Sequence, residues 1–166
     1  MVAVMSATFI FGCVHAQMKT NSINNDLAFS SPSASDFTTR YFPGINSKTF
    51  RNFKRSFPTI DNEAWYENEF AYIAKFSSNG IATMVAYGKN SSWHYTIRRY
   101  QENSLPKQVR FLVKSTYFDY MITGVDEVNV PQIPNLVYIL RLREGNNLKT
   151  VRVNDGEIEV IAEFHE

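Results

Sequence analysis

The C-terminal part of the chain contains two successive copies of one sequence pattern. The first copy covers residues 49–100 and the second covers residues 107–164. Tyr72 in the first copy corresponds to Tyr138 in the second, an offset of 66 residues. A repeat of this length is a single supersecondary unit that cannot bury its apolar face alone. The duplication therefore predicts two such units that share one sheet.

Each copy is expected to contain one helix followed by four strands. Apolar residues recur three and four positions apart in residues 48–56 and again after Leu105-Pro106, which is the period of a helix with one buried face. Short turns such as Asn79-Gly80 favour hairpins between successive strands. The expected strands cover residues 63–67, 69–77, 81–87, 93–100, 121–130, 136–143, 148–153 and 157–164.

These elements predict an α+β fold made of a tandem duplication. About eight strands form one antiparallel sheet, and two helices pack on one of its faces. Antiparallel sheets of this kind leave the second face open to solvent. We expect the folded domain to cover residues 47–166, as repeats 47–104 and 105–166, with Ser47 as the N-cap of the first helix.

The first 16 residues read as a signal peptide. Residues 2–14 are uncharged and mainly apolar, but the run is shorter than the roughly 20 residues that a membrane span needs. It ends in Val14-His15-Ala16, which predicts cleavage after Ala16 and export to the periplasm or beyond. No basic residue precedes Lys19, so the usual basic start of a signal is missing, and a buried N-terminal strand is the alternative.

The only cysteine, Cys13, lies inside this segment. Cleavage after Ala16 would leave a chain without disulfides or a thiolate nucleophile. A rival interpretation takes residues 10–13 as a lipobox with Cys13 as the lipidated residue, although the bulky Phe11 fits that pattern poorly. Residues 17–46 are rich in Ser, Asn and Thr and are expected to form a flexible leader.

Charge and motifs argue against several classes of function. The chain has 17 basic and 16 acidic residues, which predicts no binding to nucleic acid. It has no phosphate-binding loop and no dinucleotide fingerprint, and we expect no metal, no cofactor and no catalytic residue. The enzymatic alternative is a small exported hydrolase that uses His94 with Glu63 or Glu67, but no nucleophile accompanies them in a recognisable spacing.

The second copy carries a pattern of structural residues that can be compared with a known family. It reads Leu105-Pro106-x-x-Val109, Tyr117-x-x-Tyr120-x-Ile122, Val125-x-Glu127-Val128, Tyr138-x-Leu140 and Val151-x-Val153-Asn154-Asp155-Gly156-Glu157. Over about residues 49–164 the chain resembles the PepSY-like family of small exported bacterial proteins, many from Bacteroidetes. That family is related in fold to the β-lactamase inhibitory protein. The resemblance implies a non-enzymatic binding or inhibitory module.

The inhibitory relative binds its enzyme with the open sheet face and with a hairpin that inserts an acidic residue into the active site. The corresponding hairpin in this chain, residues 88–92, contains Lys89 and no carboxylate. This departure argues against β-lactamase inhibition and leaves other protein or peptide partners open.

The candidate partner-binding residues are aromatic, aliphatic and basic side chains of the first copy. If Ala82, Met84 and Ala86 point at the helices, Tyr87 faces solvent, and alignment of the two copies places one set of the next strand on the same side. Tyr, Trp and Arg are typical of protein-binding hot spots. A shift of one residue in register would instead place these side chains in the core. The candidates are Tyr87, Trp93, Tyr95, Ile97 and Arg99.

Overall fold

The computed structural model describes residues 44–165. The predicted signal peptide, its cleavage after Ala16, the lipobox at Cys13 and nearly all of the predicted leader lie outside the described residues. Within them, two α-helices and a short 3₁₀ helix accompany eight strands. Their bounds are α1 Ser47–Ser56, β1 Asp61–Glu67, β2 Ala71–Ser78, β3 Ile81–Gly88, β4 Trp93–Tyr100, η1 Glu102–Ser104, α2 Lys107–Thr116, β5 Met121–Asn129, β6 Val137–Glu144, β7 Asn147–Asn154 and β8 Glu157–His165.

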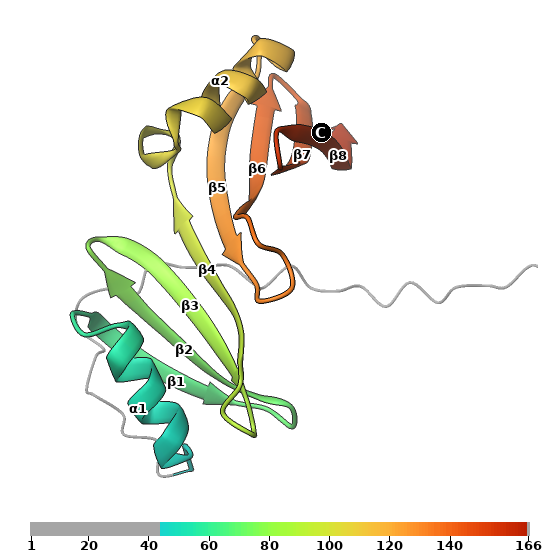
Figure 1. Cartoon of the computed structure of the whole chain (residues 1–166). Helices are drawn as coiled ribbons and strands as arrows, with labels where there is room; N and C mark the ends of the chain where they lie inside the picture. Colours follow the sequence, from blue (N-terminus) through green and yellow to red (C-terminus); the bar gives the residue numbers. More distant parts are fainter. Residues whose placement is uncertain (1–43, 166) are drawn as a thin grey trace, which may run out of the picture. The chain divides into compact units, whose positions relative to one another are not determined.

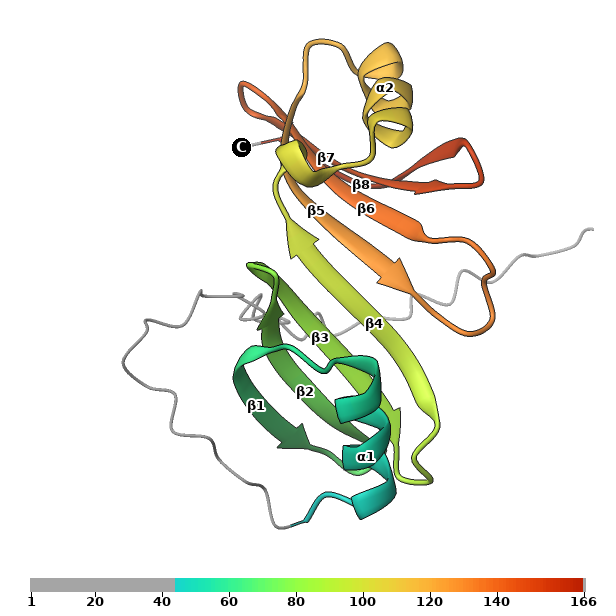
Figure 2. The ribbon, with the colours of Figure 1, turned by 60° about the vertical axis from the view of Figure 1, so that its left-hand side comes forward.

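The eight strands form one sheet in chain order, and every neighbouring pair is antiparallel. This confirms the predicted α+β architecture. Both helices pack on the same face of the sheet, α1 over the first strands and α2 over β5 to β7 (Figures 1 and 2). No helix formed by residues 44–165 lies on the opposite face, which we call the open face.

The first helix begins at Ser47, one residue earlier than predicted, and its cap is correspondingly one residue earlier. Asn46 accepts a hydrogen bond from the backbone N–H of Lys48 at 2.8 Å, so Asn46 and not Ser47 caps α1. An amide oxygen at this position satisfies one of the N–H groups that the first helical turn leaves unpaired. Lys54 and Arg55 in the last turn suit the negative end of the helix.

An aromatic cluster forms the core of the first half. Phe53 on α1 is fully buried and contacts three other rings, including Trp65 at 4.9 Å and Phe76 at 5.2 Å between centroids, both edge-to-face. Edge-to-face packing is favourable because the positive ring edge meets the negative ring face. The cluster consists of Phe53, Trp65, Tyr72, Ala74, Phe76, Val85 and Tyr87.

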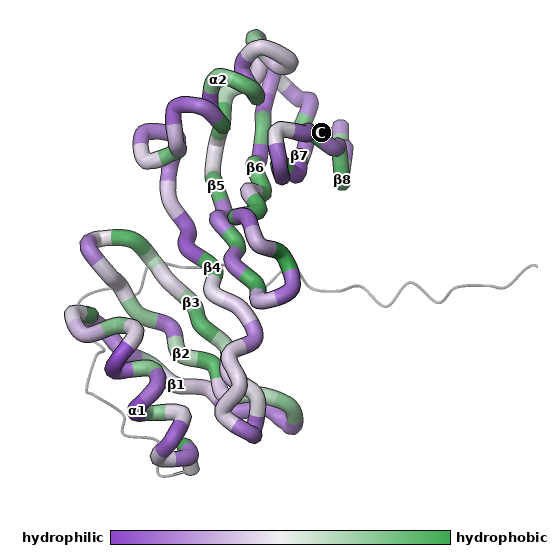
Figure 3. The backbone as a smooth tube through the Cα atoms, in the orientation of Figure 1, coloured by the Kyte–Doolittle hydropathy of each residue, from purple (hydrophilic) through white to green (hydrophobic). Residues whose placement is uncertain are grey.

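A second cluster forms the core of the other half, beneath α2. It is mainly aliphatic. Hydrophobic residues recur along β6 (Figure 3), and every second side chain from Tyr138 to Leu142 enters the cluster. Its buried members are Tyr100, Leu105, Val113, Ile122, Val125, Tyr138, Leu140, Leu142, Val151 and Val153. The two clusters share no buried residue.

The two halves meet at β4 and β5, and ion pairs join these two strands on both faces. On the helix-covered face, Glu127 accepts hydrogen bonds from Arg98 at 3.1 Å and from the Tyr100 hydroxyl at 2.8 Å. Burial, together with this bond to Glu127, raises the pKa of Tyr100 well above its ordinary value. On the open face, Arg99 lies directly opposite Asp126. The seam is therefore held by backbone pairing and ion pairs together with the apolar pairs Tyr100–Val125 and Ile97–Val128.

Candidate functional site

The open face presents side chains in rows that cross the sheet from strand to strand. The row through the seam runs across all eight strands because each of its members is paired with the next in register. Its members are Asp61, Ser77, Ala82, Arg99, Asp126, Ile139, Arg152 and Glu159. The neighbouring rows place Met84 beside Ile97 and Ala86 beside Tyr95.

Of the five residues singled out from the sequence, three lie together on the open face. Tyr95, Ile97 and Arg99 alternate along β4 and are all partly exposed. The other two were placed on the wrong side. Tyr87 is only 3% exposed and belongs to the core beneath α1, and Trp93 packs against the same cluster.

Tyr87 was misplaced because Ala82, Met84 and Ala86 lie on the open face instead of pointing at the helices. A β-bulge in the β3–β4 hairpin explains the misplacement of Trp93. Tyr87 pairs with Trp93, but the preceding Ala86 pairs with Tyr95, so His94 is an extra residue in β4. An extra residue reverses the alternation of side chains on one strand relative to its partner. Trp93 therefore faces the helix side while Tyr95 faces the open side, although they are two residues apart.

Apolar side chains gather around Tyr95 and Ile97. Ile73, Ala86 and Tyr95 form one row, and Tyr66 on β1 pairs with Ile73. Tyr66 is 50% exposed. We call the group made by Tyr66, Ile73, Met84, Ala86, Tyr95 and Ile97 the apolar patch.

An ion cluster borders the apolar patch at the seam. Asp126 accepts two hydrogen bonds from Arg99, at 2.6 Å from Nε and 2.9 Å from Nη2, and one from Arg141 Nη1 at 2.9 Å. The fork-shaped contact with Arg99 is the strong bidentate type. Two guanidinium groups thus share one carboxylate. We call Arg99, Asp126 and Arg141 the arginine cluster.

Gly124 makes room for this arrangement. It pairs with Arg141 across β5 and β6, and a Cβ atom at Gly124 would lie 2.4 Å from Arg141 Nη2. The missing side chain lets the guanidinium lie across the strand and reach Asp126. The repeat pattern does not single out Gly124. A glycine in the middle of a strand is the one sequence feature that could have indicated this close approach of a side chain.

The two arginines of the cluster, Arg99 and Arg141, control the ionisation of Asp126. Burial favours the neutral acid, but the hydrogen bonds and charges of Arg99 and Arg141 outweigh it and hold the pKa of Asp126 below its ordinary value of 3.8. The hydrogen bond with Asp126 in turn raises the pKa of Arg99 above its ordinary value.

This shift predicts acid sensitivity. A carboxylate whose pKa is lower in the folded state stabilises the fold above its unfolded pKa, and the stabilisation disappears as pH falls through the folded pKa. We expect the free energy of unfolding of the native protein to fall from pH 5 toward pH 2 more steeply than that of Asp126→Asn, as measured by urea denaturation at each pH. Parallel curves would contradict the role of Asp126.

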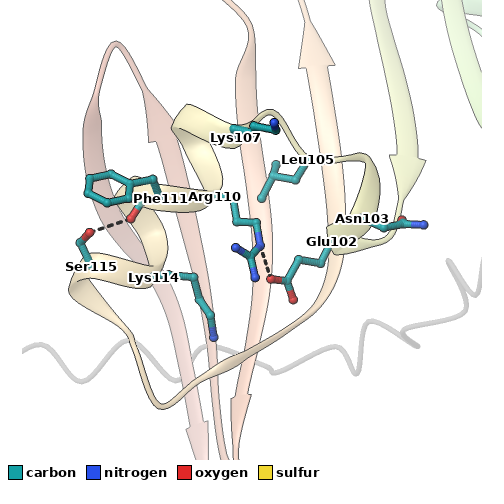
Figure 4. A pocket seen from close by; sticks show the side chains of 8 residues that line it. All are labelled: Glu102, Asn103, Leu105, Lys107, Arg110, Phe111, Lys114 and Ser115. Carbon is teal, nitrogen blue, oxygen red and sulfur yellow. Dashed lines mark hydrogen bonds and ion pairs between the residues drawn. The ribbon is translucent and has the colours of Figure 1, made fainter.

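A large hollow lined by described residues lies elsewhere, on the surface of α2 (Figure 4). It has a volume of about 1030 Å³. Its cations are largely engaged, because Arg110 pairs with Glu102 at 2.6 Å and Lys114 donates to the carbonyl oxygen of Tyr120 at 2.6 Å. The hollow therefore offers a partly neutralised helix surface, with Phe111 exposed at its rim.

The residues of the hydrolase hypothesis do not come together. His94 is exposed on the bulge, and within residues 44–165 no carboxylate lies within hydrogen-bonding distance of its ring. Glu63 pairs with Lys54 and accepts from the indole N–H of Trp65, while Glu67 pairs with Lys89 of the β3–β4 hairpin. Among the described residues, no group of three His, Cys, Asp or Glu side chains is placed to hold a metal ion.

Solved structures with the same fold come from Bacteroides. A BLIP-like protein from Bacteroides fragilis superposes with a TM-score of 0.62 at 19% identity, covering 76% of this chain and 89% of that one. A DUF2874 family protein from Bacteroides uniformis gives a TM-score of 0.60 at 19% identity, with 73% and 89% covered. A predicted periplasmic protein from Bacteroides eggerthii gives 0.58 at 18% identity, with 72% and 88% covered.

The chain thus has a BLIP-like fold. At these identities the likeness establishes the fold and nothing more. No protein-family model matches the sequence, and no curated protein matches it either. Neither helix in the described part of the chain is long and apolar enough to cross a membrane.

Proposed function

We propose that this protein is an exported, non-enzymatic binding or inhibitory module, a member of the PepSY-like group, whose open face engages a protein or peptide partner in the cell envelope. The observation that carries the proposal is the apolar patch next to the arginine cluster on the open face. Apolar groups on such a face remain accessible to a partner, while the fold is stabilised by the cores on the other side.

The composition of this surface suits protein recognition. Tyr and Arg are enriched among the residues that dominate binding energies, and they act best at the centre of a patch from which water is excluded. Tyr95 and Ile97 form the border of the apolar patch on β4, and Arg99 follows them on the same strand, so they join the patch to the arginine cluster.

Two further observations support export and a binding role. The N-terminal segment has the length and the closing residues of a signal peptide. The fold is shared with a BLIP-like protein and with a predicted periplasmic protein. Placement in the periplasm or outside the cell follows from the signal, and a lipid anchor at Cys13 is the less favoured form.

Site-specific photo-crosslinking tests the proposal. A photoreactive amino acid at position 97, on the open face, is expected to give an adduct with a protein in cells that export the chain. The same group at position 98, on the helix-covered face, is the matched control and is expected to give none.

The partner identified in this way allows a second measurement. Tyr95→Ala combined with Ile97→Ala is expected to weaken its binding at least tenfold, since hot-spot truncations cost about 2 kcal/mol or more. His94→Ala, an exposed change on the same strand, is expected to leave the affinity unchanged. Equal affinity of the double variant and the native protein would rule out the apolar patch.

A further inference from the structure

We propose that a pocket between α1 and β4 binds a small organic carboxylate with a flat, apolar body. The pocket has a volume of about 350 Å³, and its lining comes from α1, the C-cap residue of α1, β3, the β3–β4 hairpin and β4. We call it the α1–β4 pocket. It lies on the helix-covered side of the sheet, so this inference goes beyond the proposed function, which concerns the open face.

Three aromatic rings supply the apolar part of the α1–β4 pocket. Phe57 and Trp93 are partly buried and pack against the core of the first half, and Tyr87 belongs to that core. Sites for small molecules usually measure roughly 300–1,000 Å³ and combine apolar walls with a few polar groups. The volume and the rings therefore suit a ligand about the size of one aromatic ring with a short substituent.

The charge of the pocket comes from one side chain. Arg55 is the charged residue of the lining, and none of the lining residues is acidic. Arg55 is exposed, and no carboxylate within residues 44–165 forms an ion pair with it, whereas the preceding Lys54 is paired with Glu63. The C-terminal end of α1 offers roughly half a negative charge. The Arg55 guanidinium is therefore incompletely balanced beside the aromatic walls.

Two hydroxyl groups of the pocket already accept a hydrogen bond and keep a hydrogen to donate. Thr96 Oγ1 accepts from the indole N–H of Trp93 at 3.0 Å, and an indole N–H can only donate. Ser91 is buried, and its Oγ accepts from the hydroxyl of Thr49 at 2.8 Å. Each hydroxyl has one hydrogen of its own. Within the described part of the chain, neither of these hydrogens has an acceptor.

These groups favour a ligand that is negative and that only accepts hydrogen bonds. An amine would bring a second positive charge to Arg55 and would find no carboxylate in the pocket. A carboxylate only accepts, and its two oxygens match both a guanidinium fork and hydroxyl hydrogens. A ring attached to that carboxylate would lose contact with water against Phe57 and Trp93. A flat organic acid therefore suits the charged and the apolar parts of the pocket together.

NMR spectroscopy of the purified, ¹⁵N-labelled chain tests the proposal. Phenylacetate is the probe, and phenylacetamide is the control ligand of the same shape without the charge. The indole N–H of Trp93 reports binding, and Trp93→Phe identifies its signal among those of the two tryptophans. We expect phenylacetate to shift this signal with a dissociation constant of about 1 mM, as is usual for so small a ligand. Phenylacetamide is expected to bind at least about fivefold more weakly, because it lacks the charge-assisted hydrogen bonds.

Two arginines of α1 provide a matched pair of variants. Arg55→Gln removes the charge of the pocket and is expected to bind phenylacetate and phenylacetamide equally well. Arg51→Gln removes the same charge one helical turn earlier, from an exposed residue outside the lining, and is expected to keep the preference for phenylacetate. Arg55→Lys keeps the charge without the fork and is expected to show an intermediate preference. Circular dichroism would confirm that all three variants fold.

The carboxylate could belong to a free acid or to the C-terminus of a peptide. The tripeptide Gly-Gly-Phe and its C-terminal amide distinguish these sources. Binding of phenylacetate without binding of the tripeptide would assign the pocket to free acids. Tighter binding of the tripeptide than of phenylacetate would assign it to chain ends. Both results support the proposal, provided that the preference for the carboxylate is lost in Arg55→Gln.

Other results would overturn it. Equal affinity of the native chain for phenylacetate and phenylacetamide would exclude recognition of the charge. An equal loss of preference in Arg51→Gln and Arg55→Gln would indicate general attraction by a basic helix. Inorganic phosphate that shifted the Trp93 signal as strongly as phenylacetate would exclude a role for the aromatic walls. A Trp93 signal unchanged by every probe at about 10 mM, ten times the expected dissociation constant, would exclude the pocket itself. Each of these results leaves the open-face proposal standing, since crosslinking at position 97 probes the other side of the sheet.

Discussion

Replacement of Phe53 by alanine is expected to lower the free energy of unfolding by about 3–5 kcal/mol, the usual cost of truncating a buried aromatic side chain. Phe53 is fully buried, and its ring contacts Phe57, Trp65 and Phe76. The variant removes apolar area and leaves a cavity that rigid neighbouring rings cannot fill. Urea denaturation followed by circular dichroism would measure the loss.

The same variant tests whether the halves behave as separate cores. Because the clusters share no buried residue, amides of β2 are expected to lose hydrogen-exchange protection more than those of β6. Leu140→Ala, in the other cluster, is the matched variant and is expected to give the opposite pattern. Equal loss in both halves would show that they unfold as one unit.

Tyr87→Ala is expected to act on stability and not on binding. The Tyr87 side chain is 3% exposed beneath α1, so its truncation should cost about 3–5 kcal/mol by the same cavity argument. Burial raises the pKa of the Tyr87 hydroxyl, and a hydrogen bond with Ser56 partly opposes that shift. Tyr87→Phe keeps the ring and is expected to lose much less stability.

Chemical denaturation combined with the affinity assay distinguishes this result from an open-face role. Tyr95→Ala truncates a side chain that belongs to neither core. It is expected to change stability far less than Tyr87→Ala while weakening partner binding. If Tyr87→Phe and Tyr87→Ala both folded normally and both bound the partner weakly, Tyr87 would be a recognition residue, and the assignment of faces would be wrong.

Much of the fold could be predicted from the sequence because its signals are local. Turns such as Asn79-Gly80 specify hairpins, and sequential hairpins fix the order of the strands. Because the two copies are related, the elements assigned in the first copy also predict those of the second. Residue-level errors arise at the ends, as at Asn46, where two neighbouring residues are both good caps.

The assignment of faces depended on a feature without a local signal. His94 is one ordinary residue in a strand of alternating side chains, and nothing in its neighbours marks it as the bulge. That single residue decides whether Tyr87 and Tyr95 share a face. The assumed orientation of β3 and the alignment of the two copies predicted that they do, and the bulge places them on opposite sides.

The arginine cluster could not be predicted for a different reason. Its members lie 27 and 15 residues apart along the chain, on three strands. Their meeting depends on the β4–β5 register across the boundary of the two repeats, where the connection contains α2 and no hairpin turn fixes the pairing. Without that register, arginines scattered along the chain are expected to be ordinary surface residues.

The separation of the two cores has a consequence for how such a chain can change over time. The two clusters share no buried residue, so each core can vary on its own after the duplication, although Tyr100 of the first copy belongs to the second core. The residues that must change together are those of the seam, where Arg98 forms an ion pair with Glu127 and Arg99 forms one with Asp126. In an alignment of relatives, we would expect correlated replacement at these four positions and independent variation in the rings around Phe53.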